Sequence, residues 1–183
     1  MNNVNIPCVN EHKHLGIHFD SNLKWSLHID NVINSVSKMV SVMQKLKFML
    51  SKETLLSIYT SFVRSKLEYG CVVWDDCTDN DKLRLEKIQI RCAQIITGAK
   101  KGTRHELLYK ESSLSTLSSR RKEFKLKMMY KIVKFNEPKY LYDCLPKKIE
   151  NSYSLRDSAK IRFVRARTEK FRKSFIPDCI RLV

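Results

Sequence analysis

Glycine and proline are scarce in this sequence, with four of each among 183 residues. An all-β protein with many tight turns needs more of both, so their scarcity favours helices. No apolar run approaches the ~20 residues of a membrane-spanning helix, and we expect no membrane partner. The N-terminus also has no basic segment ahead of an apolar stretch, so we expect an intracellular protein, nuclear or cytoplasmic.

Closely spaced cysteine pairs are missing as well. The six cysteines are scattered and form no C-x-x-C motif. Disulfide scaffolds are usually shorter and denser in cysteine, so we expect reduced thiols. Cys92 falls on an apolar helical face and is expected to be a core residue.

Two candidate metal sites lack the pattern that metal chemistry requires. Cys8 with His12, His14 and His18 does not have paired zinc-ligand spacing, which favours surface histidines over zinc. We place these three histidines on one strand face, opposite Leu15, Ile17 and Phe19. A second candidate is Asp75–Asp76, followed by Asp79 and Asp81. It has no third carboxylate on a preceding strand, so a helix-capping turn is favoured over a two-Mg²⁺ site.

Positive charge is plentiful and unevenly distributed. The net charge is +16. Residues 1–99 carry 12 Lys and Arg against 10 Asp and Glu, whereas residues 100–183 carry 23 against 9. A basic excess concentrated in one half of the chain favours a polyanion partner, with nucleic acid ahead of an anionic membrane. The alternative is an ordinary solvated surface.

Apolar periodicity in the first half predicts a short hairpin and three helices. The hairpin falls within residues 4–20, where Gly16 and the Asn10–Glu11 step suggest it and Leu15, Ile17 and Phe19 have the period of a strand with one buried face. Helices are predicted over 26–50, 52–67 and 81–97, the first two as an antiparallel pair. Ser26, Ser51 and either Asp79 or Asn80 are candidate N-caps, and Gly98 is a candidate C-terminal glycine. We expect residues 71–74 to be extended.

The second half is predicted to be a basic loop followed by basic helices. Residues 98–113 are expected to form the loop. A helix over 117–136 has apolar residues on one side, namely Leu117, Phe124, Met128, Ile132 and Phe135, and lysines and arginines on the others. A short helix ends at Pro146. From residue 147 on, charges are dense and order is doubtful.

An ordered set of motifs runs through most of the chain. It consists of His14-Leu15-Gly16-Ile17-His18-Phe19-Asp20, Leu23-Lys24-Trp25, His28-Ile29, Leu67-Glu68-Tyr69-Gly70 with Trp74, and the segment from Leu85 to Ala99. Arg120-Arg121 and Lys173-Ser174-Phe175-Ile176-Pro177 follow. In this order the set resembles the region after the catalytic palm in reverse transcriptases of non-LTR (LINE-type) retrotransposons. His14 stands where that family usually has tyrosine.

This resemblance implies a mainly α fold. An N-terminal β-hairpin remnant of the palm (1–24) would be followed by an antiparallel helical thumb-like domain (25–99). A basic helical extension (100–183) would come last, partly flexible toward its end. The palm's metal-binding aspartates would lie upstream of residue 1, so we expect a piece of a longer polymerase. This chain alone would then bind no cofactor and catalyse nothing, because the missing palm would hold the Mg²⁺.

The resemblance also implies a function and a set of residues. The chain would contact an RNA or DNA template–primer duplex through phosphates, and it would also contact the missing fingers and palm. The predicted nucleic-acid-binding residues are Lys100, Lys101, Arg104, Arg120, Arg121, Lys122, Lys125, Lys127 and Lys131. The predicted structural motif residues are Leu15, Gly16, Trp25, His28, Glu68, Tyr69, Gly70 and Trp74. Trp25, Tyr69 and Trp74 are expected in the core, with base stacking as the alternative. Two other functions stay open: a domesticated stand-alone nucleic-acid-binding protein and a protein-docking helical module.

Overall fold

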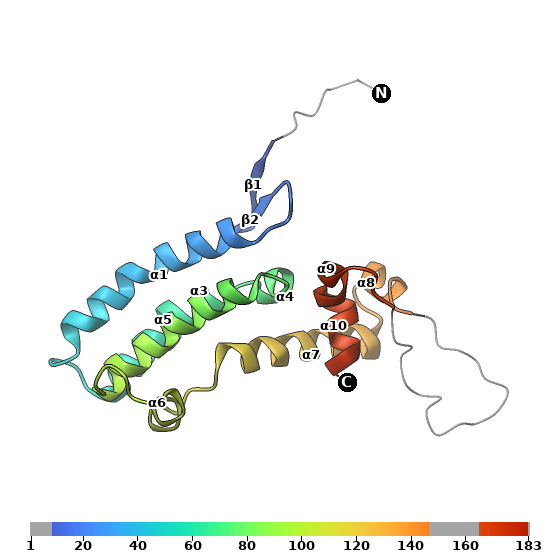
Figure 1. The fold of residues 1–183 in the computed structure, drawn as a ribbon. Coiled ribbons are helices and arrows are strands. Elements are labelled where there is room, and N and C mark those ends of the chain that lie inside the picture. The colour runs from blue at the N-terminus through green and yellow to red at the C-terminus, as the bar shows by residue number, and fades with distance from the viewer. Residues whose placement is uncertain (1–8, 147–164, 183) are drawn as a thin grey trace, which may run out of the picture. The chain divides into compact units, whose positions relative to one another are not determined.

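The computed structural model describes residues 9–146 and 165–182. These residues are mainly helical, with a two-stranded antiparallel hairpin near the start, which confirms the predicted fold class (Figure 1). None of the helices in these ranges is both long and apolar enough to cross a membrane.

The chain divides into two compact units, which are described separately. The first unit comprises Met1–Gly70 and Cys77–Ser118, and the second comprises Cys71–Asp76 and Ser119–Val183. The predicted functional division at residues 24 and 99 concerns parts of a polymerase rather than compact units, and it stays a prediction.

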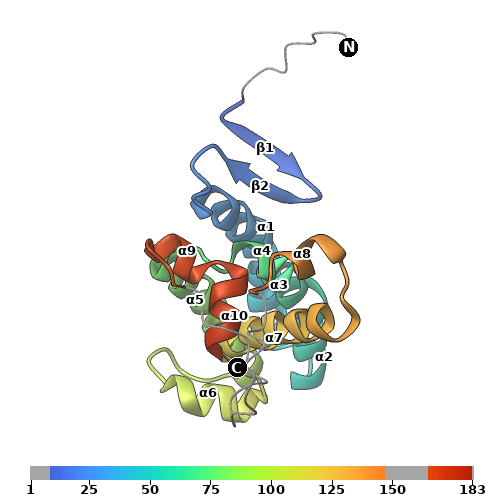
Figure 2. The ribbon, with the colours of Figure 1, turned by 90° about the vertical axis from the view of Figure 1, so that its right-hand side faces the viewer.

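In the first unit, β1 (Glu11–His14) and β2 (Ile17–Asp20) form the hairpin, which leads directly into α1 (Figure 2). Leu15 and Gly16 join the strands, with φ angles of 45° and 82°. Two consecutive positive φ angles are the mark of the type I′ turn, whose twist suits an antiparallel pair. The predicted hairpin is therefore confirmed. Leu15, however, is 76% exposed in the turn and is not part of a buried strand face.

The register of the hairpin corrects the predicted histidine face. His14 pairs with Ile17, and His12 pairs with Phe19. Directly paired residues share one face of a sheet. His12 and His14 therefore lie on the same face as Ile17 and Phe19, and His18 lies on the other. The prediction assumed that side chains alternate between the two faces through Leu15 and Gly16, but these residues form the turn, where the alternation does not hold.

Helix α1 (Ser26–Leu46) confirms the most regular apolar stripe in the sequence. Its buried side chains are His28, Ile29, Val36, Val40 and Met43. Trp25 occupies the N-cap position, so the assignment of Ser26 as the cap was wrong. Ser26 is the first helical residue, and its hydroxyl donates to the buried Asp81 carboxylate at 2.9 Å.

The next helical run is continuous through α2 (Lys52–Ile58), the π-helix η1 (Tyr59–Arg64) and α3 (Ser65–Glu68). Ser51 caps it, since the Ser51 hydroxyl accepts the Thr54 N–H. This confirms the predicted cap. Both η1 and α3 pack against α1, as expected for a pair joined by a short connection.

A buried polar chain fixes the π-helical segment against α5. Tyr59 and Gln89 are both completely buried. The Tyr59 hydroxyl donates to the Gln89 side-chain carbonyl, and the Gln89 amide donates to the Ser115 carbonyl at 3.0 Å. Burial raises the pKa of Tyr59, so its hydroxyl stays protonated and remains a donor.

Helix α5 (Asp79–Thr97) begins at a different cap from the predicted one. Thr78 is the N-cap, and its hydroxyl accepts the N–H of the residue three positions on. Asp79 and Asn80 are already inside the helix. The predicted C-terminal glycine is confirmed, because Gly98 adopts a left-handed conformation with φ 69°.

Residues 98–113 are not a loop throughout, because α6 (His105–Ser112) forms within them. The buried Leu108 anchors this helix, and the Tyr109 hydroxyl donates to the Glu86 carboxylate of α5. One buried leucine in a polar stretch gives too weak a periodicity to predict a helix, which explains the error.

The second unit opens with a helical turn, α4 (Cys71–Trp74), where an extended segment was predicted. Cys71 is 3% exposed and Trp74 is 0% exposed. A spacing of three residues puts both side chains on one face of a helix, whereas a strand would put them on opposite faces. The helical turn therefore buries both ends of this segment on one side.

The remaining helices are α7 (Leu117–Phe135), α8 (Lys139–Asp143), α9 (Glu169–Lys173) and α10 (Phe175–Leu182). The first two confirm the predicted helices before Pro138 and Pro146. The last two lie where order was expected to be doubtful, so that expectation was wrong for residues 165–182. Residues 147–164 lie outside the described part of the chain.

Candidate nucleic-acid interface

Helix α7 carries most of the predicted nucleic-acid-binding residues. Its buried side chains recur at helical spacing and include Arg121, Lys125, Met129 and Ile132. Lys122, Lys127 and Lys131 are exposed, as phosphate contact requires, and Arg120 is half-buried with its guanidinium 5.6 Å from the Phe124 ring centroid.

Arg121 and Lys125 are part of a buried charge cluster rather than of the surface. Arg121 Nε lies 2.7 Å from Asp75 Oδ1, and Lys125 Nζ pairs with both Asp75 and Asp178. Arg121 is 2% exposed, Lys125 4% and Asp75 6%. Burial acts to lower the pKa of Lys125, but its bonds to Asp178 and Asp75 outweigh this and raise it, so the ammonium stays charged.

This cluster corrects three sequence predictions. Arg121 and Lys125 point into the second unit, where their charges are already compensated, so they are not available to phosphates. Asp75 is not a helix-capping residue, because both of its carboxylate oxygens are engaged by the two cations. The cluster ties α7 to residues 71–76 and to α10, and these partners are 46 to 53 residues apart in sequence.

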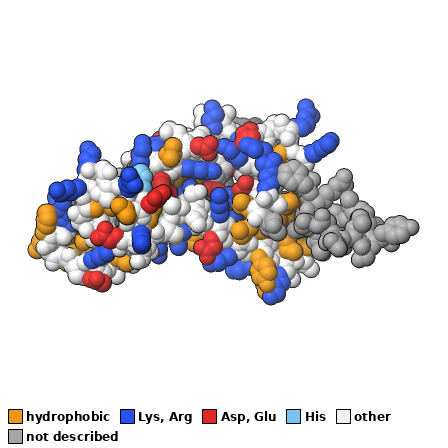
Figure 3. Space-filling view, turned by 60° about the horizontal axis from the view of Figure 1, so that its bottom comes forward, with side chains coloured by type: hydrophobic (Ala, Val, Ile, Leu, Met, Phe, Trp, Pro, Cys, Tyr) orange, Lys and Arg blue, Asp and Glu red, His pale blue; other side chains and the backbone are white. Residues whose placement is uncertain are grey.

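The exposed lysines of α7 are interspersed with apolar side chains. A groove of about 780 Å³ is lined by residues that include Phe124, Lys127, Met128, Tyr130, Lys131 and Phe135. On the face of the molecule drawn in Figure 3, blue Lys and Arg side chains are interspersed with orange hydrophobic ones. The sequence placed Phe135 on the apolar side of the helix, but it is 58% exposed. It lies at the last position of α7, where no further turn covers it.

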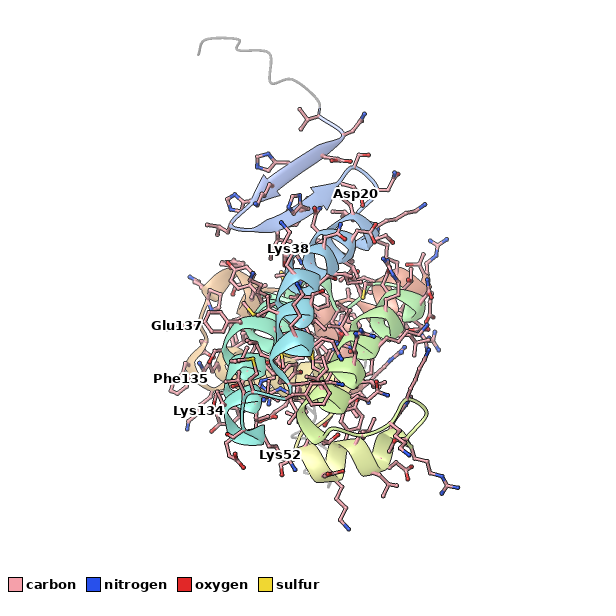
Figure 4. All side chains as sticks on the ribbon, turned by 90° about the vertical axis from the view of Figure 1, so that its left-hand side faces the viewer. Asp20, Lys38, Lys52, Lys134, Phe135 and Glu137 are labelled. Atoms are coloured by element: carbon pink, nitrogen blue, oxygen red, sulfur yellow. The ribbon has the colours of Figure 1, made fainter. Side chains whose placement is uncertain are left out.

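Lys134 adds a basic residue that the predicted list missed. Its Nζ lies 5.3 Å from the centroid of the Tyr130 ring and 5.4 Å from that of Phe135. Figure 4 labels Lys134, Phe135 and Glu137 next to one another at the outer surface. The sequence signal was available, because Tyr130 and Lys134 are four residues apart on a predicted helix.

The other predicted basic residues lie in the first unit. Lys100 and Lys101 are exposed in the connection after α5, and Arg104 is the exposed N-cap residue of α6. The Thr103 N–H donates to the Lys100 carbonyl at 3.2 Å, which fixes the turn. All three residues lie on the short connection between α5 and α6, and their role in binding nucleic acid stays a prediction.

The motif residues around the hairpin form one structural group. The Tyr69 hydroxyl donates to the Leu15 carbonyl at 2.8 Å. Gly70 has φ 60°, and a Cβ there would lie 2.8 Å from Ile17 Cδ1, so glycine is required for the close approach of β2. Gly16 faces the Tyr69 ring. Glu68, which precedes Tyr69, is half-buried.

The aromatic and histidine motif residues are mostly buried. Trp25 is 7% exposed and packs edge-on against Phe19, and Trp74 in the second unit is fully buried. Neither ring can therefore stack on a base. Tyr69 is 55% exposed, so the prediction that it lies in the core was wrong. His28 is 2% exposed at the start of α1, and burial, with the nearby His18, lowers its pKa.

Among the described residues, no group of three or more His, Cys, Asp or Glu side chains could hold a metal ion. The exposed rings of His12 and His14 stack on one another, with their centroids 6.2 Å apart. Cys8, the fourth member of the candidate zinc set, lies outside the described residues. The cysteines described in this structure are free, and burial raises the pKa of the Cys92 thiol to about 12, consistent with a core residue.

Comparison with curated proteins finds a similarity to a transposon polymerase. The chain is 29% identical over 117 residues to the "Probable RNA-directed DNA polymerase from transposon X-element" of Drosophila melanogaster. The alignment covers 62% of this chain but only 13% of that protein. No family model matches the chain, and no solved structure matches it. The similarity supports a relationship to reverse transcriptases.

Proposed function

We propose that this chain is a nucleic-acid-binding part of a non-LTR retrotransposon reverse transcriptase, C-terminal to the catalytic palm. It grips the template–primer duplex through phosphate contacts and does not polymerise by itself. The observation that carries the proposal is the row of exposed lysines on α7, formed by Lys127, Lys131 and Lys134. The similarity to a transposon RNA-directed DNA polymerase supports it.

The spacing of the three lysines suits a phosphate backbone. They recur at steps of four and three, which places them on one side of the helix. The row spans about 10 Å along the helix axis, and a B-form duplex presents about six phosphate charges over that length. Such contacts position a duplex without reading its sequence, as a polymerase that copies any template requires.

Lys127 has one competing partner. Its ammonium lies 2.6 Å from a Glu123 carboxylate oxygen, in a pair that is more than half exposed. Exposed pairs of this kind contribute little, so a phosphate can replace the carboxylate at small cost.

The contribution of Lys127, Lys131 and Lys134 to duplex affinity is tested with a labelled RNA–DNA duplex and fluorescence anisotropy. The triple variant Lys127→Gln/Lys131→Gln/Lys134→Gln is expected to weaken binding at least tenfold. The matched control, Lys24→Gln/Lys38→Gln/Lys66→Gln, removes the same charge from exposed sites in the first unit. Equal weakening by both variants would mean that net charge alone drives binding, and the proposed site would be wrong.

The absence of polymerase activity has its own test. Polymerisation needs carboxylates that hold two Mg²⁺ ions, and in this proposal the palm supplies them. Asp75, the strongest carboxylate candidate in the sequence, already compensates Arg121 and Lys125. The purified chain is expected to leave a primer unextended in the presence of Mg²⁺ and deoxynucleotides. Extension that scales with the amount of chain would contradict the proposal.

A second candidate function is docking onto the rest of the polymerase. Phe48 and Met49, in the connection between α1 and α2, are 86% and 79% exposed. Two adjacent apolar side chains this exposed fit a contact with another protein surface. Co-expression with a fingers–palm segment tests this, because Phe48→Ser/Met49→Ser should abolish co-purification while leaving duplex binding intact.

A further inference from the structure

The groove on α7 combines apolar and basic side chains in one continuous surface. The described residues that line it all belong to the second unit, and its volume of about 780 Å³ lies in the range of ligand-binding clefts. A second hollow of about 450 Å³ shares Lys131 and Phe135 with it and extends to Glu137 and Pro138. The surface therefore continues past the end of the helix.

Two aromatic rings on this surface are exposed without a core role. Tyr130 is 59% exposed and Phe135 is 58% exposed. Lys134 holds its ammonium about 5 Å from both ring centroids, so one cation sits beside two π-faces. The exposed remainder of each ring is open to a further planar group.

The charges that line the groove favour one kind of binding partner over another. Among the residues that the structure describes, the charged side chains lining the groove are Lys127 and Lys131, with no carboxylate, and Glu137 lines only the adjoining hollow. An apolar helix from a partner protein would leave the lysines without a counter-charge. A nucleic acid strand offers both parts of the complement, with bases for the rings and phosphates for the ammonium groups.

Duplex nucleic acid supplies the phosphates for the ammonium groups but no exposed base faces for the rings. Paired bases are stacked on their neighbours inside the duplex, so the rings of Tyr130 and Phe135 cannot reach their faces. Unpaired bases expose their faces, and aromatic side chains that stack on them within a basic groove are a recurring means of binding single strands.

We propose that this groove binds unpaired nucleotides, with bases stacked on Tyr130 and Phe135 and flanking phosphates held by Lys127, Lys131 and Lys134. This inference rests on the proposed function and extends it from duplex phosphates to single-stranded nucleic acid. The same lysines serve both, whereas the rings contribute only where bases are unpaired.

The test compares three labelled probes of the same length: oligo(dT), an abasic oligonucleotide with the same phosphates, and an RNA–DNA duplex. The whole chain is expected to bind oligo(dT) at least tenfold more tightly than the abasic strand, since stacking of one base is worth about that much. In Tyr130→Ala/Phe135→Ala the oligo(dT) affinity should fall to the abasic level, while abasic and duplex affinities stay within twofold.

Two variants control for general effects. Tyr130→Phe/Phe135→Tyr keeps both rings and should retain the preference for oligo(dT). Phe62→Ala removes another exposed ring, which is 54% exposed in the first unit, and it should leave the affinities for all three probes unchanged. Thermal melting of each variant checks that the fold is kept.

Equal binding of oligo(dT) and the abasic strand by the unaltered chain would overturn the stacking proposal, as would an unchanged preference in the double alanine variant. Either result is still compatible with the proposed function if Lys127→Gln/Lys131→Gln/Lys134→Gln weakens duplex binding. Failure of the unaltered chain to bind any of the three probes at low salt would overturn both proposals.

Discussion

Substitution of Asp75 by asparagine should destabilise the protein strongly. Asparagine keeps the shape of the side chain but removes the negative charge that compensates Arg121 and Lys125. Asp75 is 6% exposed, and its Oδ1 lies 2.7 Å from Arg121 Nε. At that distance the attraction between unit charges is about 6 kcal/mol for an effective dielectric constant near 20.

The measurable loss is smaller than this Coulomb energy, because the charged groups recover some hydration when the pair breaks. Removal of one partner from a buried ion pair typically costs about 3–5 kcal/mol. Lys125 keeps Asp178 as a partner, so the uncompensated charge falls mainly on Arg121. We therefore expect the free energy of unfolding of Asp75→Asn to fall by about 3 kcal/mol or more, as for a broken buried pair.

Urea denaturation followed by circular dichroism measures this loss. Asp143→Asn, an exposed carboxylate in the same unit, is the matched control and should change stability by less than about 0.5 kcal/mol. The double variant Asp75→Asn/Arg121→Gln should lose clearly less than the sum of the single losses. A loss below about 1 kcal/mol for Asp75→Asn, or strict additivity with Arg121→Gln, would refute the buried cluster.

Further predictions concern the turn, the buried histidine and the buried tyrosine. Gly70→Ala should lower stability more than Gly98→Ala, because both glycines have positive φ but only at Gly70 would a Cβ meet a side chain, at 2.8 Å; thermal melting of the two variants compares them. The pKa of His28 is lowered by burial, so the folded state favours its neutral form and stability should fall as the pH drops below about 6.5. His28→Gln should flatten that part of the stability profile, and an unchanged profile would assign the pH dependence to other groups. Tyr59→Phe should cost about 1–3 kcal/mol in urea unfolding, because the Gln89 carbonyl loses its buried donor; no loss would show that this bond is not formed.

Much of the fold follows from local patterns that the sequence displays. The stripe of α1 and the end of α5 at Gly98 depend on residues within a few turns of one another, and both were predicted. The hairpin was also predicted, but the side on which its histidines lie was not. That side depends on the two-residue turn at Leu15 and Gly16, which interrupts the alternation.

The site was harder to predict because burial of a charge depends on distant partners. Arg121 and Lys125 are indistinguishable in sequence from their exposed neighbours on α7. Their carboxylate partner Asp75 is 46 residues from Arg121, and the Asp178 partner is 53 residues from Lys125. Helical periodicity does separate them in retrospect, since both align with the buried Met129 and Ile132.

Single substitutions of two cations on α7 test whether buried cations stabilise the fold and exposed ones bind nucleic acid. Arg121→Gln should lower stability and leave duplex affinity unchanged in a folded sample. Lys131→Gln should lower duplex affinity and leave stability unchanged, because Lys131 is exposed and makes none of the buried pairs.

The salt dependence of binding to an RNA–DNA duplex tests the central claim most directly. Log affinity should fall linearly with log salt, and each phosphate contact contributes a slope of about 0.9. Loss of Lys127, Lys131 and Lys134 should therefore reduce the slope by about 2.7, whereas the control triple variant in the first unit should leave it unchanged. A slope that is identical in the unaltered chain and the α7 variant would contradict the assignment of this helix as the nucleic-acid interface.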